Sequence, residues 1–314
     1  MPLSLLPIAF FKLRRIIGLA LVSLALAGCS MVRLAYDQAP NLTYWWIDGY
    51  VDSSGEQTTR LRESIDRWYV WHARTQLPDY AALLARAQRE VLAPLTPAAA
   101  CAWVADAERR VATALEAAVP AAAELMLSLT PAQLQHIERR MGKGNEEMRA
   151  DFLQADPEER KAASLKRALE RFERIYGRLD GAQRERLAAL LAQSSFDAER
   201  WLSERRLRQR DILQTLRTVS LASASGDRAA ALQQAQAAAR VLFERTLRSP
   251  RADYRAVRQR LVQDNCQLVA TLHNAMTPTQ RQAARNKLKG WEDDLRALSA
   301  GAGKAAESSD AASR

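Results

Sequence analysis

From residue 56 onward, apolar side chains recur at steps of three and four positions, which is the spacing of an amphipathic helix. Alanine, leucine, arginine, glutamate and glutamine dominate, glycine is sparse, and the alternation of β-branched residues typical of strands is missing. The pattern predicts an all-α fold, an irregular bundle of long amphipathic helices after an aromatic-rich N-terminal segment. The predicted helices cover residues 56–74, 78–93, 97–127, 131–154, 157–178, 181–222, 227–248, 251–275 and 278–298.

The longest predicted helix, 181–222, carries an apolar stripe on one side. Charged residues fill the other side, where Glu204 and Arg208 have the i, i+4 spacing that favours an ion pair. A helix with such a stripe is not stable alone in water, so it must pack in a bundle or against a partner. The stripe consists of Leu187, Leu190, Leu191, Ser194, Trp201, Leu202, Ile212, Leu213 and Leu216.

A short motif recurs four times, with Leu or Met followed by Thr or Asp and, in three copies, by a glutamine three residues later. Thr or Asp can accept hydrogen bonds from the free N–H groups of a first helical turn, and the glutamine can bond back to the capping residue. Each copy therefore predicts a helix start. The spacings between copies are unequal, which argues against a regular solenoid. The copies are Leu95–Ala98, Leu129–Gln133, Leu179–Gln183 and Met276–Gln280.

Aromatic residues are concentrated near the N-terminus, where eight of the chain's twenty lie between residues 36 and 71. Two interpretations fit this density: a packed base for the bundle, which we favour, or a set of anchors at a membrane interface. Arg33, Asp48 and Asp52 are interspersed and could form ion pairs with one another. The aromatic residues are Tyr36, Tyr44, Trp45, Trp46, Tyr50, Trp68, Tyr69 and Trp71.

The chain begins with a lipoprotein secretion signal. Three cationic residues precede the apolar run 16–27, which ends in Leu26-Ala27-Gly28-Cys29. The run is too short for a membrane helix, which needs about 20 residues. We expect cleavage between Gly28 and Cys29 and acylation of Cys29, and each buried methylene of an acyl chain contributes about 0.8 kcal/mol to anchoring. Because Ser30 rather than an aspartate follows, we expect a lipid anchor in the outer membrane, with the body facing the periplasm.

These features divide the chain into four expected parts. Residues 1–28 form the signal peptide, 29–55 the lipidated N-terminus with its aromatic-rich segment, and 56–298 the helical domain. The small, polar stretch 299–314 is expected to be disordered.

The chain has a formal net charge of +10, which falls to +7 when residues 1–28 are removed. Basic charge often indicates nucleic acid, but an exported protein does not meet that partner. The expected partners are the membrane, through the N-terminal lipid, and an envelope protein or an unfolded polypeptide.

Two cysteines, Cys101 and Cys266, remain when Cys29 is lipidated. In an oxidising compartment an even number of cysteines favours a disulfide, which here would close a loop of 165 residues. The alternative is two buried free thiols that behave as small hydrophobic side chains.

Chemistry-bearing motifs are scarce. The basic run Arg200, Arg205, Arg206, Arg208 and Arg210 is either a solvated helix face or a surface for anionic segments or lipid head groups. The three histidines are isolated, and no metal-binding, phosphate-binding or nucleophile-elbow motif occurs. We therefore expect no catalytic residues, no metal site and no cofactor, although a pair of glycan-cleaving carboxylates would not be visible in sequence.

Several segments of the chain resemble one known protein family. The lipobox followed by Arg33-Leu34-Ala35-Tyr36, the segment 46–52, the region 68–78 and the segment 200–210 resemble a family of helical lipoproteins of Gram-negative bacteria known only as a domain of unknown function. That resemblance covers most of the mature chain and implies a helical envelope lipoprotein without an assigned activity.

At the motif level, Leu129–Gln133 and Met276–Gln280 are similar to the Leu-Thr-x-x-Gln signature of the Spy and CpxP type of periplasmic chaperone. That resemblance implies a helical cradle with a basic concave surface that holds unfolded chains without ATP. The sequence therefore leads to a non-catalytic binding or scaffold lipoprotein as the first hypothesis, with a Spy-like holdase and a cell-wall enzyme as alternatives.

Overall fold

The computed structural model describes residues 31–222 and 227–312, which form ten helices and no strand. The predicted all-α class is confirmed. The expected cleavage and lipidation residues, Gly28 and Cys29, lie outside the described part. The helices are α2 (Met31–Val51), α3 (Gly55–Glu90), α4 (Pro97–Ser128), α5 (Pro131–Phe152), α6 (Pro157–Tyr176), α7 (Gly181–Ala192), α8 (Ala198–Ala222), α9 (Arg228–Leu247), α10 (Ala252–Asn274) and α11 (Pro278–Ala312).

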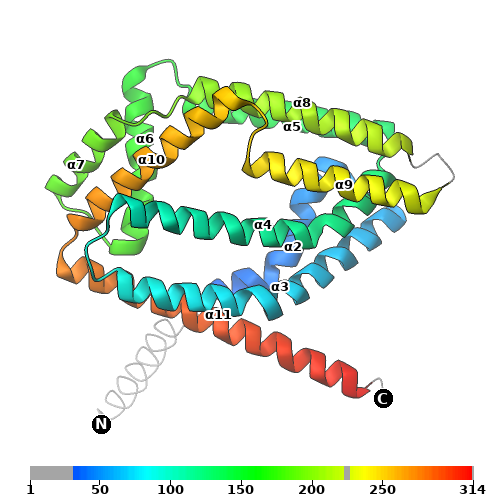
Figure 1. Cartoon of the computed structure of the whole chain (residues 1–314), viewed down its shortest axis with the longest axis horizontal. Helices are drawn as coiled ribbons and strands as arrows, with labels where there is room; N and C mark the ends of the chain where they lie inside the picture. The colour runs from blue at the N-terminus through cyan, green and yellow to red at the C-terminus, as the bar shows by residue number, and fades with distance from the viewer. Residues whose placement is uncertain (1–30, 223–226, 313–314) are drawn as a thin grey trace, which may run out of the picture.

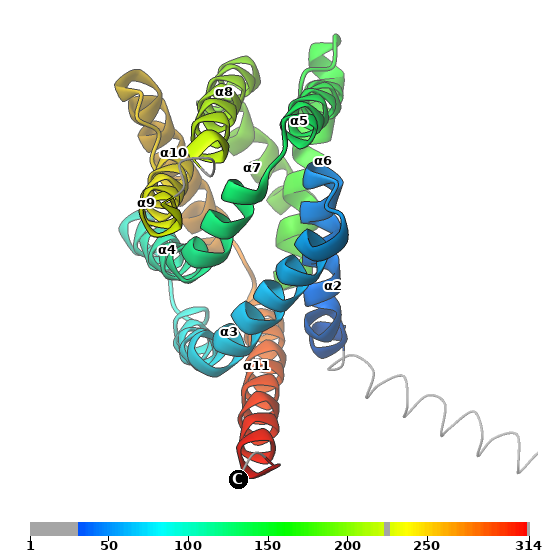
Figure 2. The same cartoon turned by 90° about the vertical axis from the view of Figure 1, so that its right-hand side faces the viewer.

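Long helices pack side by side around a central pair. In Figure 1, α5 and α8 lie along one edge, α3 and α11 lie along the opposite edge, and α4 and α9 run between them. Helices α6, α7 and α10 close one end. Figure 2 places α2, α5 and α6 on one side of the molecule and α9 and α10 on the other. This arrangement brings the starts of helices that are far apart in sequence next to each other.

The four predicted helix starts are present. Thr96, Thr130 and Asp180 each accept a hydrogen bond from the backbone N–H three residues on, at the starts of α4, α5 and α7. Thr277 does the same at the start of α11, where it accepts from the Gln280 N–H (3.2 Å). These starts could be predicted because a cap is made within four consecutive residues.

Two boundaries differ from the prediction because distant contacts override local signals. Helix α3 continues through Pro78, where a break was expected, and Leu77 and Ala81 on either side of that proline are completely or almost completely buried. This packing compensates for the backbone hydrogen bond that the proline removes. The helix predicted over 181–222 is instead interrupted between α7 and α8, where the Ser195 N–H donates to the Asp264 carboxylate (2.8 Å).

The first and last segments of the described part of the chain are more helical than expected. The aromatic-rich segment forms α2, with Pro40 inside it. Helix α11 runs to Ala312, so the prediction of a disordered tail from residue 299 differs from the structure. Alanine is the strongest helix former, and its frequency in this stretch favours continuation of the helix over disorder.

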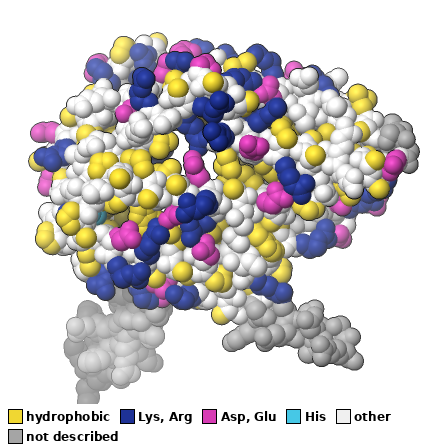
Figure 3. Space-filling model, in the orientation of Figure 1, with side chains coloured by type: hydrophobic (Ala, Val, Ile, Leu, Met, Phe, Trp, Pro, Cys, Tyr) yellow, Lys and Arg dark blue, Asp and Glu magenta, His cyan; other side chains and the backbone are white. Residues whose placement is uncertain are grey.

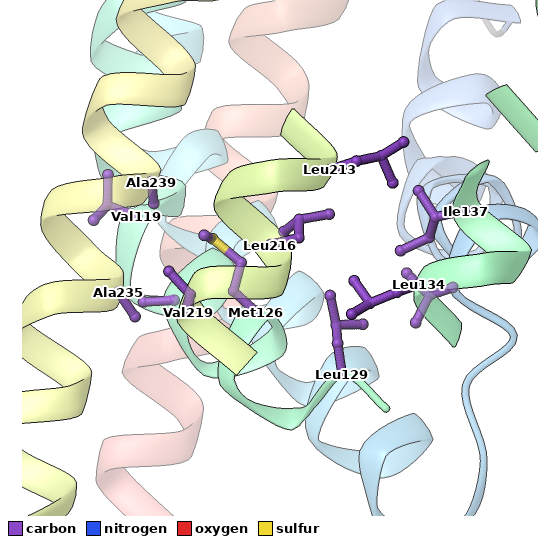
Figure 4. Close-up of a cluster of buried hydrophobic side chains, with 12 residues drawn as sticks. Val119, Met126, Leu129, Leu134, Ile137, Leu213, Leu216, Val219, Ala235 and Ala239 are labelled. Carbon is purple, nitrogen blue, oxygen red and sulfur yellow. The ribbon is translucent and has the colours of Figure 1, made fainter. Parts of the chain in front are cut away.

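The largest core cluster joins α4, α5, α8 and α9. Figure 4 shows Leu213 and Leu216 of α8 pointing toward Leu134 and Ile137 of α5, while Met126 of α4 lies on the side of α9. A second cluster joins α6, α7 and α10 through Leu179, Leu187, Leu268, Leu272 and Met276. A smaller third cluster of Tyr44, Leu61 and Ile65 joins α2 to α3, and α4, which belongs to the first cluster, packs against α10 of the second.

Candidate binding cleft

A cleft of about 390 Å³ opens between the start of α3, the end of α4 and the start of α9. This volume falls in the range of small-molecule and side-chain binding sites. Residues from three helices surround the cleft, so it exists only in the folded bundle. The lining residues are Glu56, Gln57, Arg60, Leu61, Ser64, Ala121, Glu124, Leu125, Leu127, Ser128, Arg228, Ala231 and Leu232.

The lining of the cleft combines apolar side chains with charges of both signs. Leu61 and Ala231 are buried in its wall, and leucines from α4 and α9 complete the apolar part. Arg60 donates to Glu56 one turn away (2.5 Å). Glu124 and Arg228 are exposed and form no ion pair among the described residues. The cleft therefore suits a ligand with apolar groups and flanking charges of both signs.

Motif glutamine Gln133 fixes one end of this cleft. Its side-chain amide donates to the Asp52 carbonyl (3.1 Å) and to the Gln57 side-chain oxygen (2.6 Å). Gln57 in turn donates to the Ser128 hydroxyl (2.8 Å). The starts of α3 and α5 and the end of α4 are thus tied together beside the cleft.

The second pair of motif glutamines makes a similar junction elsewhere. Gln183 donates to the Ala275 carbonyl (2.9 Å) and to the Gln280 side-chain oxygen (2.7 Å). Gln280 returns a bond to the Gln183 side-chain oxygen (2.9 Å) and donates to the Arg178 carbonyl (3.0 Å). The starts of α7 and α11 are therefore held against each other, a role that capping alone does not predict.

A disulfide joins Cys101 of α4 to Cys266 of α10, with 5.4 Å between the two Cα atoms. Of the two alternatives that the sequence left open, the structure contains the bridge. It connects the N-terminal half of α4 to α10, at the opposite end of α4 from the cleft. The bond thereby cross-links two helices that already pack together.

The five arginines of the basic run do not form one surface. Arg205 donates to the Asn145 side-chain oxygen (2.8 Å) between α5 and α8, and Arg200 lies 3.8 Å from the Asp253 carboxylate. Arg208 is half-buried, whereas Arg206 and Arg210 are exposed. The residues are spread around α8 because their spacing does not follow the helical period. On the face shown in Figure 3, basic and acidic side chains are interspersed.

Two expected ion pairs also have different partners. Glu204 does not pair with Arg208: it is buried and accepts from the Ser249 hydroxyl (2.7 Å) and from Arg251 (3.3 Å). Arg33 does not pair with an acid of its own segment. It donates instead to Asp294 of α11 (2.8 Å), a buried carboxylate. Contacts between helices that are far apart in sequence determine these ion pairs, so the spacing of residues along the chain does not predict them.

Two histidines accept or donate hydrogen bonds inside the bundle, of which His273 is buried and His72 half-buried. His273 lies between the Ala93 carbonyl (2.8 Å from Nε2) and the Tyr176 hydroxyl (2.8 Å from Nδ1). Since a carbonyl can only accept, Nε2 carries the hydrogen and Nδ1 accepts from Tyr176. Burial lowers the pKa of His273 and raises the pKa of Tyr176 to about 12, so both groups stay neutral.

His72 lies in the aromatic cluster beside α2. The Tyr36 hydroxyl is 2.8 Å from His72 Nδ1, and the His72 ring stacks on Trp68. Burial lowers the pKa of His72 and raises that of Tyr36. The third histidine, His136, has Nε2 3.3 Å from the Gly49 carbonyl. Within residues 31–222 and 227–312, no group of three or more His, Cys, Asp or Glu side chains could hold a metal ion.

The aromatic-rich segment is divided between core and surface. Tyr44 is buried with Leu61 and Ile65, as the favoured interpretation expects. Trp45 and Trp46, the next two residues, are 62% and 68% exposed.

In the described part of the chain, α4 is long and apolar enough to cross a membrane by length and composition alone. In this structure α4 contacts α3, α8, α9 and α10, and a core helix satisfies the same criteria.

The cleft residues were missed in the sequence because Leu61, Leu125 and Leu232 belong to helices that are far apart along the chain. Gln57 lies three residues after the N-cap Ser54, which is the spacing of the motif glutamines, but Ser53 precedes that cap instead of Leu or Met and the Ser54 side chain makes no capping bond.

Comparison with known protein families places this helical bundle in a class without an assigned activity. A model of a family of unknown function, DUF6279, matches residues 49–236, which is more than half of the chain. The chain belongs to the DUF6279 family. The matched region includes the residues that line the cleft. Searches of curated proteins and of solved structures found no significant match.

Proposed function

We propose that this chain is an outer-membrane lipoprotein whose helical body is a non-catalytic binding module, and that the cleft between α3, α4 and α9 receives a segment of a partner polypeptide. The cleft is the observation that carries the proposal. It has an apolar wall, charges of both signs at its edge and a volume of about 390 Å³. These properties match an amphipathic peptide segment with two or three apolar side chains. Binding of such a segment in an apolar groove is a common form of peptide recognition.

The location rests on the sequence before the first described helix. Gly28-Cys29 ends an apolar run of signal-peptide length, and Ser30 follows it. A protein held in the outer membrane by acyl chains on Cys29 meets other envelope proteins at high local concentration. A modest cleft is sufficient under these conditions, because tethering reduces the affinity that the contact itself must supply.

The cleft can be tested by filling it. Ala121 lines the cleft on α4, and Ala112 is an exposed residue of the same helix. We expect Ala121→Trp to lower recovery of a crosslinked partner from intact envelopes at least roughly tenfold, because the indole occupies the apolar wall. Ala112→Trp is the matched control and should leave recovery unchanged. Equal recovery with both variants would exclude the cleft as the binding site.

The holdase is the second candidate. The exposed apolar residues and net positive charge would support it, but the arginines of α8 do not form the single basic surface that it would use. A holdase suppresses aggregation of several unrelated unfolding proteins, and added salt reduces the effect. A dedicated binding module retains one partner and does not suppress such aggregation at stoichiometric excess.

A further inference from the structure

The outer face of α2 is mainly apolar, with the exposed charged residues Arg33 and Asp37 along one edge. Leu34, Leu42, Trp45 and Trp46 are 57%, 53%, 62% and 68% exposed. The exposed residues between and beside them are Ala35, Gln38, Asn41 and Gly49, and Asp37 borders them next to Leu34 and Asn41. Such a concentration of large exposed apolar side chains on one helix marks an interaction surface.

The opposite face of α2 holds the helix to the body. The Tyr36 hydroxyl bonds to His72 (2.8 Å) and the Thr43 hydroxyl to the Tyr69 hydroxyl (2.9 Å). Tyr44 is buried and stacks beneath the Arg62 guanidinium (3.6 Å from the ring centre). With 3.6 residues per turn, Tyr36 and Thr43 lie on the side away from Trp45 and Leu34, and Tyr44 lies between the two sides. The outer face therefore stays available while α2 is fixed in place.

The sequence indicates what covers this face. Cys29, the expected lipid-attachment residue, precedes Met31, the first residue of α2, by two positions. Acyl chains at that position would bring the start of α2 to the bilayer surface. Tryptophan is enriched at the depth of lipid head groups, where its apolar ring and polar N–H are both accommodated.

We propose that α2 lies in the plane of the membrane interface, with Leu34, Leu42, Trp45 and Trp46 inserted among phospholipid head groups. This placement rests on the proposed lipid anchor for its location, while the apolar face is a property of the folded chain. Helix α2 lies on one side of the molecule and α9 and α10 on the other, as Figure 2 shows. Docking through α2 therefore turns α9 and α10 away from the bilayer and fixes the orientation of the body.

The test uses the full-length lipidated protein reconstituted into vesicles of phosphatidylethanolamine and phosphatidylglycerol. Brominated phospholipids quench tryptophan emission only at short range. We expect quenching in the wild-type protein, and we expect the double variant Trp45→Phe, Trp46→Phe to remove most of it. No quenching, or equal quenching in the double variant, would overturn the proposal.

A second measurement separates this face from the anchor. The unlipidated Cys29→Ser protein should bind the same vesicles weakly. Leu42→Ser should lower that partitioning roughly fifty-fold, because about three buried methylene equivalents are lost. Leu221→Ser, at a residue of α8 that is 76% exposed, is the matched control and should have no effect. Unchanged far-UV circular dichroism shows that each variant is folded.

Other outcomes identify other occupants of the face. A wild-type dimer that Leu42→Ser dissociates, with no vesicle binding, would assign the outer face to a second copy and overturn the membrane proposal. Absence of palmitate labelling at Cys29 would refute the lipid anchor instead. In that case the vesicle binding of the Cys29→Ser protein still supports or overturns docking through α2.

Discussion

The glutamine pair that joins α7 to α11 should contribute several kcal/mol to stability. Gln183 is 4% exposed, and its side chain makes four hydrogen bonds: one with the Asp180 N–H (3.1 Å), one with the Ala275 carbonyl (2.9 Å) and two with the Gln280 side chain (2.7 and 2.9 Å). Gln183→Leu keeps the volume but removes all four bonds and leaves their partners unsatisfied. At about 1 kcal/mol for each net hydrogen bond, the loss in unfolding free energy is about 4 kcal/mol.

Urea unfolding followed by circular dichroism measures this loss. Because Gln183 and Gln280 bond to each other, Gln280→Leu should also destabilise the protein. Because two bonds join the two side chains, the double variant should lose about 2 kcal/mol less than the sum of the two single losses. Gln282→Leu, on the exposed side of α11, is the matched control, with an expected change within about 0.5 kcal/mol. Small, strictly additive losses would refute a coupled junction.

Two further predictions concern the disulfide and the dependence of stability on pH. Replacing Cys101 and Cys266 with serine opens a loop of 165 residues and should lower the unfolding free energy, measured by urea unfolding, by up to about 5 kcal/mol. This prediction would be contradicted if neither the serine variant nor a reductant changed the melting curve. The pKa values of His72 and His273 are lowered in the folded state, so the unfolded chain binds protons more readily than the folded chain does. The contribution of these histidines to the free energy of unfolding is therefore complete above pH 6.5 and decreases as the pH falls below that value. His273→Gln should flatten this part of the profile, and a slope equal to that of the wild type would count against the buried neutral imidazole.

Helix type and helix starts could be predicted because they depend on neighbouring residues. The caps at Thr130 and Asp180 are complete within four residues, and the sequence identifies them directly. The continuation of α3 through Pro78 depends on burial of Leu77 and Ala81 within the folded bundle. No local pattern contains that information.

The candidate cleft could not be predicted from the sequence for the same reason. Leu61, Leu125 and Leu232 follow ordinary helical spacing on three separate helices, and only the fold brings them to one cleft. The arginines of α8 show the opposite case. They are close in sequence, but consecutive residues of a helix point in different directions. Arg205 therefore contacts Asn145, whereas Arg206 is exposed.

Site-specific photo-crosslinking in intact cells tests most directly whether the cleft binds a partner polypeptide. A photoreactive amino acid at Leu232 lies in the cleft, and the same group at Val241, an exposed position of α9, serves as the control. We expect a discrete adduct of one size from position 232, abolished by Ala121→Trp, and none from position 241. Adducts of equal yield from both positions, or an adduct from position 232 that Ala121→Trp does not reduce, would contradict a binding function for the cleft.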